Sequence, residues 1–428
     1  MFVNETFLQE LKSKIIIEDI VSNYVSLKKR GSNAIGICPF HNEKTPSFTV
    51  YNDTQSFYCY GCATGGDAIT FLQKIENIDF IDAVRLLTQY VGVNMPDDVA
   101  DDNNWGQKKR RILEINRESA KFFHDYMMTS PKKSGLNYWH NRNITQNTIN
   151  YFSLGYAPNA WDSLLKHLKE KGFGISEMIE AGVVRKGKNN NYYDTFRNRV
   201  IIPILDVKGN IVAFSGRTID NSSSKYINSA ETIVYKKSNE LFALNLAKKS
   251  NEKSLILCEG YMDVITMYQA GITNAVSTCG TTLTQEQIKL INRYAEEVII
   301  AYDTDNAGQK AIDKAIDLFK QTDIKIKIPK LIGGKDPDEI IHSLGIDEFT
   351  TMLNEASNDI EYKLYKLKNN CNLNSANGKI QYINEAINVL KTATPVEQDL
   401  YLTELSKELN IDKRTLKLQL QYITPVSH

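Results

Sequence analysis

Short runs of alternating hydrophobic and polar residues fill the first ninety positions and predict a small, β-rich module. The β-type segments are expected at 25–29, 34–37, 47–51 and 56–58. Two helices are expected to follow, from Asp67 to Ile75 and from Asp79 to Val91. Each begins with an aspartate that can cap it by accepting bonds from the first backbone N–H groups.

A different pattern begins after residue 250, where apolar runs alternate with amphipathic stretches. The apolar runs, expected to be buried strands, span 254–258, 274–277, 298–302 and 324–328. Strands that alternate with helices in this way form βαβ units and a parallel sheet. Residues 112–182 are expected to be mainly helical, 183–217 to form strands and turns, and 346–428 to be helical throughout.

An acidic run interrupts the chain between these regions. Residues 96–104 contain four aspartates, two asparagines and a proline. This composition is a poor helix or strand former and predicts a linker or an exposed loop. We therefore expect several domains of mixed α+β and α/β class.

The charges are unevenly distributed, although the chain has 51 basic and 51 acidic residues. Residues 104–250 carry 24 basic and 12 acidic side chains, a net charge of +12, whereas residues 251–345 carry 10 and 14. A basic surface beside an acidic pocket suits an enzyme of nucleic acids, because phosphates bind the first and cations the second. A solvated surface without a ligand is the alternative interpretation of a basic run.

The cysteines and the N-terminus bear on the cellular compartment. The start, Met1 to Glu5, lacks the basic and apolar segments of a signal peptide, and the longest apolar runs are too short to cross a bilayer. Six cysteines in 428 residues are too few for a disulfide scaffold. We expect a cytoplasmic protein whose paired cysteines bind metal.

Four residues have the spacing of a zinc site. Cys38 and His41 form one C-x-x-H pair, and Cys59 and Cys62 form a C-x-x-C pair 17 residues further on. A two-residue gap lets a tight turn place both side chains on one ion, and tetrahedral Zn²⁺ takes four such ligands. The set predicts one closed, structural zinc that stabilises the small module. Three unpaired cysteines and a chance histidine are the alternative, which two coinciding spacings disfavour.

Three pairs of carboxylates follow predicted parallel strands. They are Glu259 and Asp263, Asp303 and Asp305, and Asp336 and Asp338. Open α/β sheets bind ligands at the carboxyl ends of their strands. Six carboxylates there would repel one another unless hard cations lay between them, so the spacing predicts Mg²⁺ or Mn²⁺. Two such ions suit in-line displacement at phosphorus. For one aspartate taken alone, a helix cap is the alternative.

These motifs together resemble a known family. Glu259 and Asp263 followed by Asp303-x-Asp305 resemble the Toprim domain, which DnaG-type DNA primases share with some topoisomerases and nucleases. The runs 38–48 and 57–67 are similar to the zinc ribbon of these primases, and the runs 196–203, 214–217 and 225–229 are similar to their basic subdomain. The matches extend over about residues 10 to 340, and the chain is identified as a member of the DnaG-type primase family.

The resemblance implies a DNA-directed RNA polymerase that synthesises short RNA primers on single-stranded DNA by two-metal-ion nucleotidyl transfer. The zinc module is expected to recognise template, and Glu259, Asp303, Asp305, Asp336 and Asp338 to hold metal. Asp263 either ligates metal or orients Glu259. Further residues fall where the family contacts nucleotide phosphates, template or primer. They are Arg142, Arg197, Arg199, Arg217, Lys225, Tyr226, Asn228 and Lys236.

The resemblance also implies a division of the chain. We expect a zinc-ribbon domain at 1–94, a linker at 95–111, a basic helical and β subdomain at 112–250, a Toprim parallel-sheet domain at 251–345 and a helical subdomain at 346–428. Family members usually carry a further domain that docks on the replicative helicase, and we expect it to be absent here. The expected partners are template DNA, NTPs and the RNA primer, with single-strand-binding protein as a further candidate.

Two other classes of protein stay open on sequence alone. A Toprim topoisomerase needs a nucleophilic tyrosine, and 22 tyrosines are available, while a Toprim nuclease needs none. A non-catalytic zinc-ribbon DNA-binding protein would leave the six strand-end acids without a purpose. The primase-like zinc and basic motifs favour the primase over both.

Overall fold

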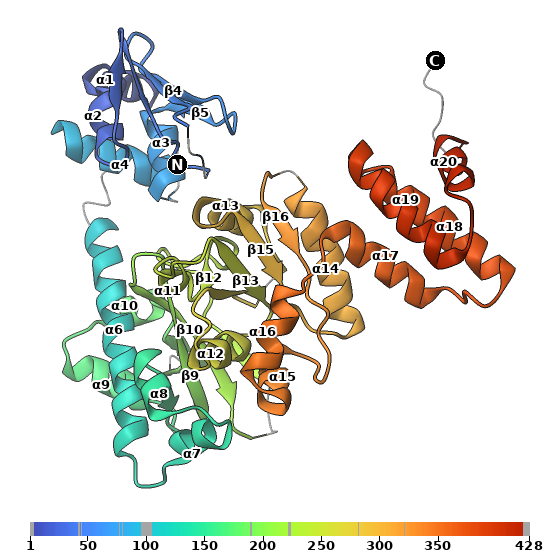
Figure 1. The fold of residues 1–428 in the computed structure, drawn as a ribbon. Helices are drawn as coiled ribbons and strands as arrows, with labels where there is room; N and C mark the ends of the chain where they lie inside the picture. Colours follow the sequence, from blue (N-terminus) through green and yellow to red (C-terminus); the bar gives the residue numbers. More distant parts are fainter. Residues whose placement is uncertain are drawn as a thin grey trace.

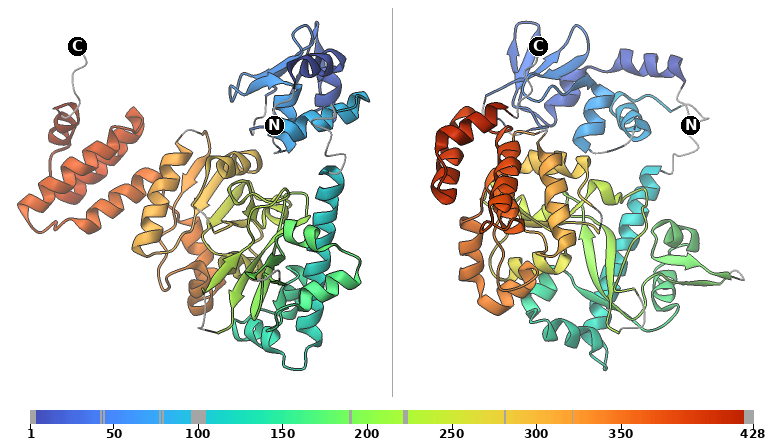
Figure 2. Two further views of the ribbon diagram at one scale, coloured as in Figure 1. Left: turned by 180° about the vertical axis from the view of Figure 1, so that it is seen from behind. Right: turned by 90° about the vertical axis from the view of Figure 1, so that its right-hand side faces the viewer.

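The computed structural model describes residues 4–41, 43, 45–76, 78, 80–95, 105–188, 191–220, 224–280, 282–320 and 322–422. Figure 1 shows an N-terminal module, a central body, and a group of C-terminal helices that extends away from that body. The views in Figure 2 show the same arrangement from behind and from the side. No helix within the described ranges combines the length and the apolar character that crossing a bilayer requires.

The N-terminal module is an antiparallel sheet flanked by short helices. Its elements are α1 (Glu5–Lys14), α2 (Ile17–Ser22), β1 (Lys28–Arg30), β2 (Asn33–Gly36), β3 (Phe48–Tyr51), β4 (Ser56–Cys59), β5 (Gly65–Asp67), α3 (Ala68–Glu76) and α4 (Phe80–Val91). The five strands pair in sequence order. Asp67 caps α3 as predicted, because Thr70 N donates to its Oδ1 at 2.9 Å. Asp79, the other predicted cap, lies outside the described residues.

A 25-residue helix, α6 (Trp105–Thr129), opens the central body. The basic run 108–111 was expected in the linker, but it lies within this helix, because lysine, arginine and glutamine are strong helix formers. The rest of the predicted linker, 96–104, lies outside the described residues. Helices α7 (Ser134–Asn141), α8 (Gln146–Tyr151), α9 (Ser163–Glu170) and α10 (Ile175–Glu180) follow.

An antiparallel sheet packs against α6. Its strands and the neighbouring short elements are β6 (Gly155–Ala157), β7 (Val184–Lys186), β8 (Tyr192–Asp194), β9 (Arg199–Leu205), β10 (Ile211–Thr218), β11 (Tyr226–Asn228), η2 (Lys237–Asn239), β12 (Leu241–Phe242) and α11 (Leu244–Ala247). The strand order is β11-β10-β9-β6, and β7 and β8 form a separate hairpin. Phe123 of α6 meets Phe214 of β10 edge to face at 5.7 Å, which joins helix and sheet.

The predicted βαβ pattern forms a second sheet, with β12 at one edge. Its elements are β13 (Ser254–Cys258), α12 (Tyr261–Gln269), β14 (Ala275–Thr278), α13 (Gln285–Tyr294), β15 (Glu297–Ile300), α14 (Asn306–Phe319), β16 (Lys325–Lys327) and α15 (Pro337–Leu344). The strand order is β12-β14-β13-β15-β16, and only β12 is antiparallel. The chain leaves β13 toward β14 and then crosses back to β15. The carboxyl ends of β13 and β15 therefore flank a topological switch point, where such sheets bind ligands.

The C-terminal region is helical, as predicted. It comprises α16 (Ile346–Asn354), α17 (Asp359–Asn370), α18 (Ala376–Leu390), α19 (Pro395–Leu409) and α20 (Lys413–Tyr422). Helix α16 packs on the central body through Phe349, whereas α17 to α20 enclose a hydrophobic core of their own around Tyr382 and Leu402. The N-terminal module also has its own core. One continuous core joins the antiparallel sheet, the parallel sheet and α16.

Candidate active site and zinc site

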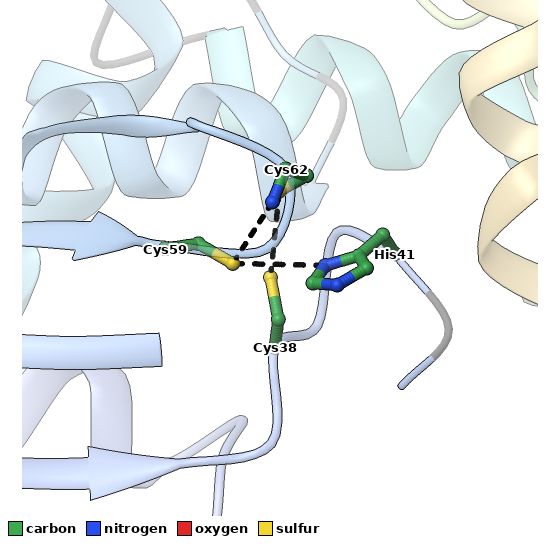
Figure 3. Close-up of side chains that lie close together, drawn as sticks. All are labelled: Cys38, His41, Cys59 and Cys62. Atoms are coloured by element: carbon green, nitrogen blue, oxygen red, sulfur yellow. Dashed lines mark hydrogen bonds between the residues drawn. The ribbon is translucent and has the colours of Figure 1, made fainter. Parts of the chain in front are cut away.

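Two turns of the N-terminal module bring the four predicted zinc ligands together (Figure 3). Their donor atoms all lie within 4.8 Å of one another. The Sγ atoms of Cys38 and Cys62 are 3.9 Å apart, and Cys59 Sγ lies 3.7 Å from His41 Nδ1. Tetrahedral zinc with Zn–S bonds of about 2.3 Å needs donors roughly 3.8 Å apart. The four side chains therefore fit a single zinc ion.

The same geometry makes a thiolate available to a metal. A hydrogen bond with Cys38 lowers the pKa of Cys62 to about 4, although burial acts in the opposite direction. The shared hydrogen bond, followed by burial, raises the pKa of Cys38. Backbone groups support the sulfurs, since the N–H groups of Phe40 and Cys62 donate to Cys38 and Cys59. Metal binding takes the place of the proton that the two thiols share.

Two of the six strand-end acids, Glu259 and Asp303, come from adjacent loops at the switch point. Glu259 follows β13 directly, and Asp303 N donates to Glu259 Oε1 at 3.4 Å. The Asp303 loop is tied to the Asp336 loop, because Thr304 N donates to Lys335 O at 2.8 Å. The fold thus joins three loops that lie far apart in the sequence.

Two of the acids cap helices with a single oxygen. Ala307 N and Gly308 N donate to Oδ1 of Asp305 at 2.9 and 2.8 Å, at the start of α14. Glu339 N donates to Oδ1 of Asp336 at 2.8 Å, at the start of α15. These bonds fix the two side chains and leave Oδ2 outside the cap. A helix cap and a metal ligand are therefore compatible roles for the same aspartate.

The remaining two acids, Asp263 and Asp338, are buried, at 4% and 5% exposure. Gly260 N and Asp338 N donate to the two oxygens of Asp263 at 3.0 and 3.3 Å. Thr266 Oγ1 donates to Oδ1 of Asp338 at 2.5 Å, and Arg142 Nη2 lies 3.2 Å from Oδ2. Both carboxylates thus bind groups of the protein itself.

Burial and crowding raise the pKa values of the acids at the switch point. Burial, with Glu259, Asp336 and Asp305 as neighbours, raises the pKa of Asp303 to about 6. Burial also raises the pKa of Glu259 and of Asp336. In the described part of the chain, no three of these acids place an oxygen each within 4.8 Å of the others. The structure thus does not bring the predicted acids together as one ligand set, and a magnesium ion, which commonly takes one or two carboxylates, would complete its shell with water and phosphate oxygens.

Two of the predicted basic residues lie in a cluster that adjoins the carboxylates. Arg142 pairs with Asp338, and the guanidinium of Arg217 lies between the rings of Tyr138 and Tyr226, 5.6 and 5.4 Å from their centroids. Arg217 Nη1 donates to Tyr226 Oη at 3.2 Å. Tyr138 belongs to none of the sequence motifs and was not predicted as a site residue.

The other predicted contacts are placed differently. Arg199 is 3% exposed and donates to Gly216 O at 3.0 Å within the antiparallel sheet. Arg197 lies against the Trp161 ring at 4.4 Å. Asn228 Nδ2 donates to Cys279 O at 3.3 Å. Lys225 and Lys236 are exposed.

A zinc ribbon, a basic subdomain and a carboxylate-lined switch point define a Toprim enzyme of nucleic acids, and family models match every part of it. They are the CHC2 zinc finger at residues 3–103, the N-terminal domain of the DNA primase catalytic core at 122–248, a Toprim-like domain at 256–341 and the DnaB-helicase binding domain of primase at 360–414.

Individual proteins agree with these matches. The DNA primase of Clostridium acetobutylicum is 39% identical over 97% of this chain and 70% of its own length. The zinc-binding and RNA polymerase domains of the Aquifex aeolicus primase superpose with a TM-score of 0.60 at 31% identity, covering 96% of this chain and 98% of that one. The RNA polymerase domain of Mycobacterium tuberculosis primase, bound to a DNA duplex with an overhang, superposes with a TM-score of 0.64 at 29% identity. The match covers 70% of this chain and 97% of that one.

The chain belongs to the DnaG-type DNA primase family. It is a DNA-directed RNA polymerase that synthesises primers on single-stranded DNA.

One prediction from the sequence is wrong. A helicase-binding domain was expected to be absent, but residues 360–414 match the family model of that domain. These residues form α17 to α19 and the start of α20, which share a hydrophobic core of their own, while Tyr362 of α17 also packs in the core of the parallel sheet. Helical periodicity alone does not distinguish the last helices of a catalytic core from a docking domain.

Proposed function

We propose that primer synthesis proceeds by metal-assisted nucleotidyl transfer at the carboxyl ends of β13 and β15. The observation that carries this proposal is the junction of three acidic loops at the switch point, where Asp303 N bonds Glu259 and Thr304 N bonds Lys335 O. Mg²⁺ or Mn²⁺ bound there neutralises the triphosphate and stabilises the attacking and leaving oxygens.

The six acids divide into two groups in this proposal. Glu259, Asp303, Asp305 and Asp336 hold the cations, because each keeps oxygen atoms outside its bonds to the protein. Asp338 holds the guanidinium of Arg142. Asp263 holds the turn that carries Glu259, through its bond from Gly260 N.

The basic cluster serves the nucleotide and the template. Arg142 and Arg217 are fixed by a carboxylate and by two aromatic rings, so their remaining N–H groups can bind phosphate with little loss of conformational entropy. Lys225 and Lys236 are exposed and suit contacts with template or primer phosphates. Arg199 has a structural role in the sheet, because its guanidinium donates to strand carbonyls.

The remaining assignments extend this proposal to the whole chain. The division with boundaries at 94, 250 and 345 describes its working units, with α6 from Trp105 onward belonging to the basic subdomain and not to the linker. The zinc module contacts template during initiation. Residues 360–414 dock on the replicative helicase, as their family match supports. The enzyme works in the cytoplasm at the nucleoid.

The test is RNA synthesis from labelled NTPs on a single-stranded template, with the zinc-loaded chain and added Mg²⁺ or Mn²⁺. Asp303→Ala and Glu259→Gln should each reduce product at least about a hundredfold, since both remove a negative charge that holds the cations at the transferring phosphate. Asp317→Ala is the matched control, because Asp317 is exposed on α14 and pairs only with Lys320 among its described contacts. Undiminished synthesis by Asp303→Ala would refute the assignment.

A second measurement separates the two groups of acids. Mn²⁺ binding, followed by electron paramagnetic resonance, should weaken in Asp303→Asn and persist in Asp338→Asn. Equal loss of Mn²⁺ in both variants would make Asp338 a ligand and overturn its assignment to Arg142.

A further inference from the structure

A carboxylate of low exposure, that of Glu43, lies beside the zinc-ligand set. His41 presents Nδ1 to the sulfur of Cys59 at 3.7 Å (Figure 3), whereas its other nitrogen, Nε2, lies 3.3 Å from Oε2 of Glu43. The side chains of His41 and Glu43 are only 12% and 10% exposed. The imidazole is thus held between the metal-binding side and a single carboxylate.

Glu43 also reaches two of the other ligand residues. Cys38 N donates to its Oε1 at 2.7 Å. Ser47 N donates to Oε1 at 3.1 Å, and Ser47 Oγ donates to Oε2 at 2.5 Å. Ser47 Oγ lies in turn 3.1 Å from the sulfur of Cys59. One carboxylate therefore contacts His41 and Cys38 directly and Cys59 through Ser47.

We propose that Glu43 is a positioning residue of the zinc site, which accepts the Nε2–H of His41 and fixes Nδ1 as the metal-binding nitrogen. A histidine that ligates a metal usually donates its other N–H to such an acceptor, which sets the tautomer and the ring orientation. The same carboxylate also fixes Ser47, whose Oγ packs against the Cys59 sulfur at 3.1 Å. The proposal requires zinc on the four ligands but no metal at the switch point, so its failure and that of the proposed catalytic site are distinguishable.

Close packing supports this assignment. A Cβ atom at Gly61 would lie 2.5 Å from His41 Nε2 and 2.9 Å from Ser47 Oγ. The backbone of the turn between Cys59 and Cys62 therefore closes over the contacts among His41, Glu43 and Ser47. A carboxylate in such a site is costly unless its oxygens are bonded, and the contacts of Glu43 meet that requirement.

The first experiment determines the tautomer by long-range ¹H–¹⁵N correlation on the full chain, labelled at histidine nitrogen and loaded with zinc. His41→Ala assigns the signal. We expect a metal-bound Nδ1 and a protonated Nε2 whose proton exchanges slowly with water. A metal-bound Nε2 would overturn the proposal.

The second experiment measures zinc affinity by competition with a chromophoric chelator. Glu43→Ala should weaken binding about ten- to a hundredfold, the range found when such partners are removed. Glu43→Gln retains the shape of the side chain but cannot accept from both His41 and the backbone N–H groups. It should therefore weaken zinc binding about tenfold and speed exchange of the His41 Nε2 proton with water. Glu10→Gln is the control, because Glu10 is exposed on α1 and pairs with Lys14. Unchanged affinity and exchange in Glu43→Gln would refute the role, even if Glu43→Ala fails to fold.

Discussion

Two glycines allow the backbone to approach the candidate metal sites more closely than any side chain would permit. At Gly308, in the first turn of α14, an added Cβ would lie 2.0 Å from the carbonyl oxygen of Asp303. At Gly61, an added Cβ would lie 2.5 Å from Nε2 of His41. Each glycine therefore determines where a ligand-bearing loop can lie.

Gly308→Ala should reduce primer extension about a hundredfold, because the loop of Asp303 or the start of α14 must shift and displacements near 1 Å have costs of that order. The measurement is the extension rate on a primed template. Gly106→Ala, where nothing lies within 4 Å of the added atom, is the matched control and should leave the rate unchanged. A normal rate in Gly308→Ala would show that the loop position is not critical.

Asp194 predicts a pH dependence of stability. Its oxygens accept Leu164 N and Leu165 N at 2.8 and 2.9 Å at the start of α9, but burial dominates and raises its pKa from 3.8 to about 6. The folded state therefore holds this proton more strongly than the unfolded state. Stability is lost as pH rises from about 4 to 6, by at most about 3 kcal/mol.

The variant Asp194→Asn isolates this effect, because its side chain stays neutral. Urea unfolding of both proteins at pH 5 and pH 7.5 should show that the parent loses stability relative to the variant at the higher pH. A difference that stays constant with pH would contradict the assignment.

At the residue scale, the sequence predicted the zinc ligands from their spacing, but it did not predict which distant side chains contact the acids. Cys38 and His41 could be paired from their spacing, because a tight turn is a local structure. The bond from Thr266 to Asp338 joins residues 72 positions apart and leaves no local pattern. Asp338 was therefore expected among the metal ligands, although its oxygens contact Thr266 and Arg142.

At the element scale, long periodic segments were predicted and short ones were not. The four predicted strands of the parallel sheet and the C-terminal helices are present. Strand β12 has two residues and β5 has three, too few for an alternation of side chains to be recognisable. Helix α6 starts earlier than expected, because the helix was predicted from Ile112 and the basic run before it was assigned to the linker.

The cap of α13 gives a prediction for one element. Thr284 accepts Gln287 N at 3.2 Å and its hydroxyl donates to Ser238 O at 2.6 Å. Thr284→Ala should destabilise the start of α13 by about 0.5–2 kcal/mol, measured as faster hydrogen exchange of its amides. Thr403→Ala is the control, since Thr403 lies inside α19 and bonds only its own helix among the described contacts. Unchanged exchange at α13 would mean that packing alone holds this end.

At the scale of the whole molecule, few polar contacts join the zinc module to the central body in the described residues. Lys208 pairs with Glu76, and Arg293 donates to the carbonyls of Lys74 and Ile75. The module has its own core, with Phe48, Phe57 and Phe71 fully buried. Exposed ion pairs contribute little stability, so the module depends mainly on its own core and its zinc.

Removal of zinc should therefore unfold the N-terminal module and spare the central body. A chelator should make residues 4–95 sensitive to protease while the rest stays resistant. Primer initiation should fall much more than extension of an annealed RNA, because the acids at the switch point lie in the central body, whose core does not include the zinc module. Equal loss of both activities would indicate that the two parts fold as one unit.

The continuous core of the central body has a consequence for how such enzymes can be recombined. Because Phe214 of the antiparallel sheet and Ile256 of the parallel sheet belong to one core, a cut near residue 250 would expose apolar surface on both sides. Replacement of residues 4–95 preserves every core intact, whereas α17 contributes Tyr362 to the core of the parallel sheet and bonds Gln309 of α14. Exchange between homologous enzymes should therefore succeed at the N-terminal module, and the polymerase body should be inherited together with α17.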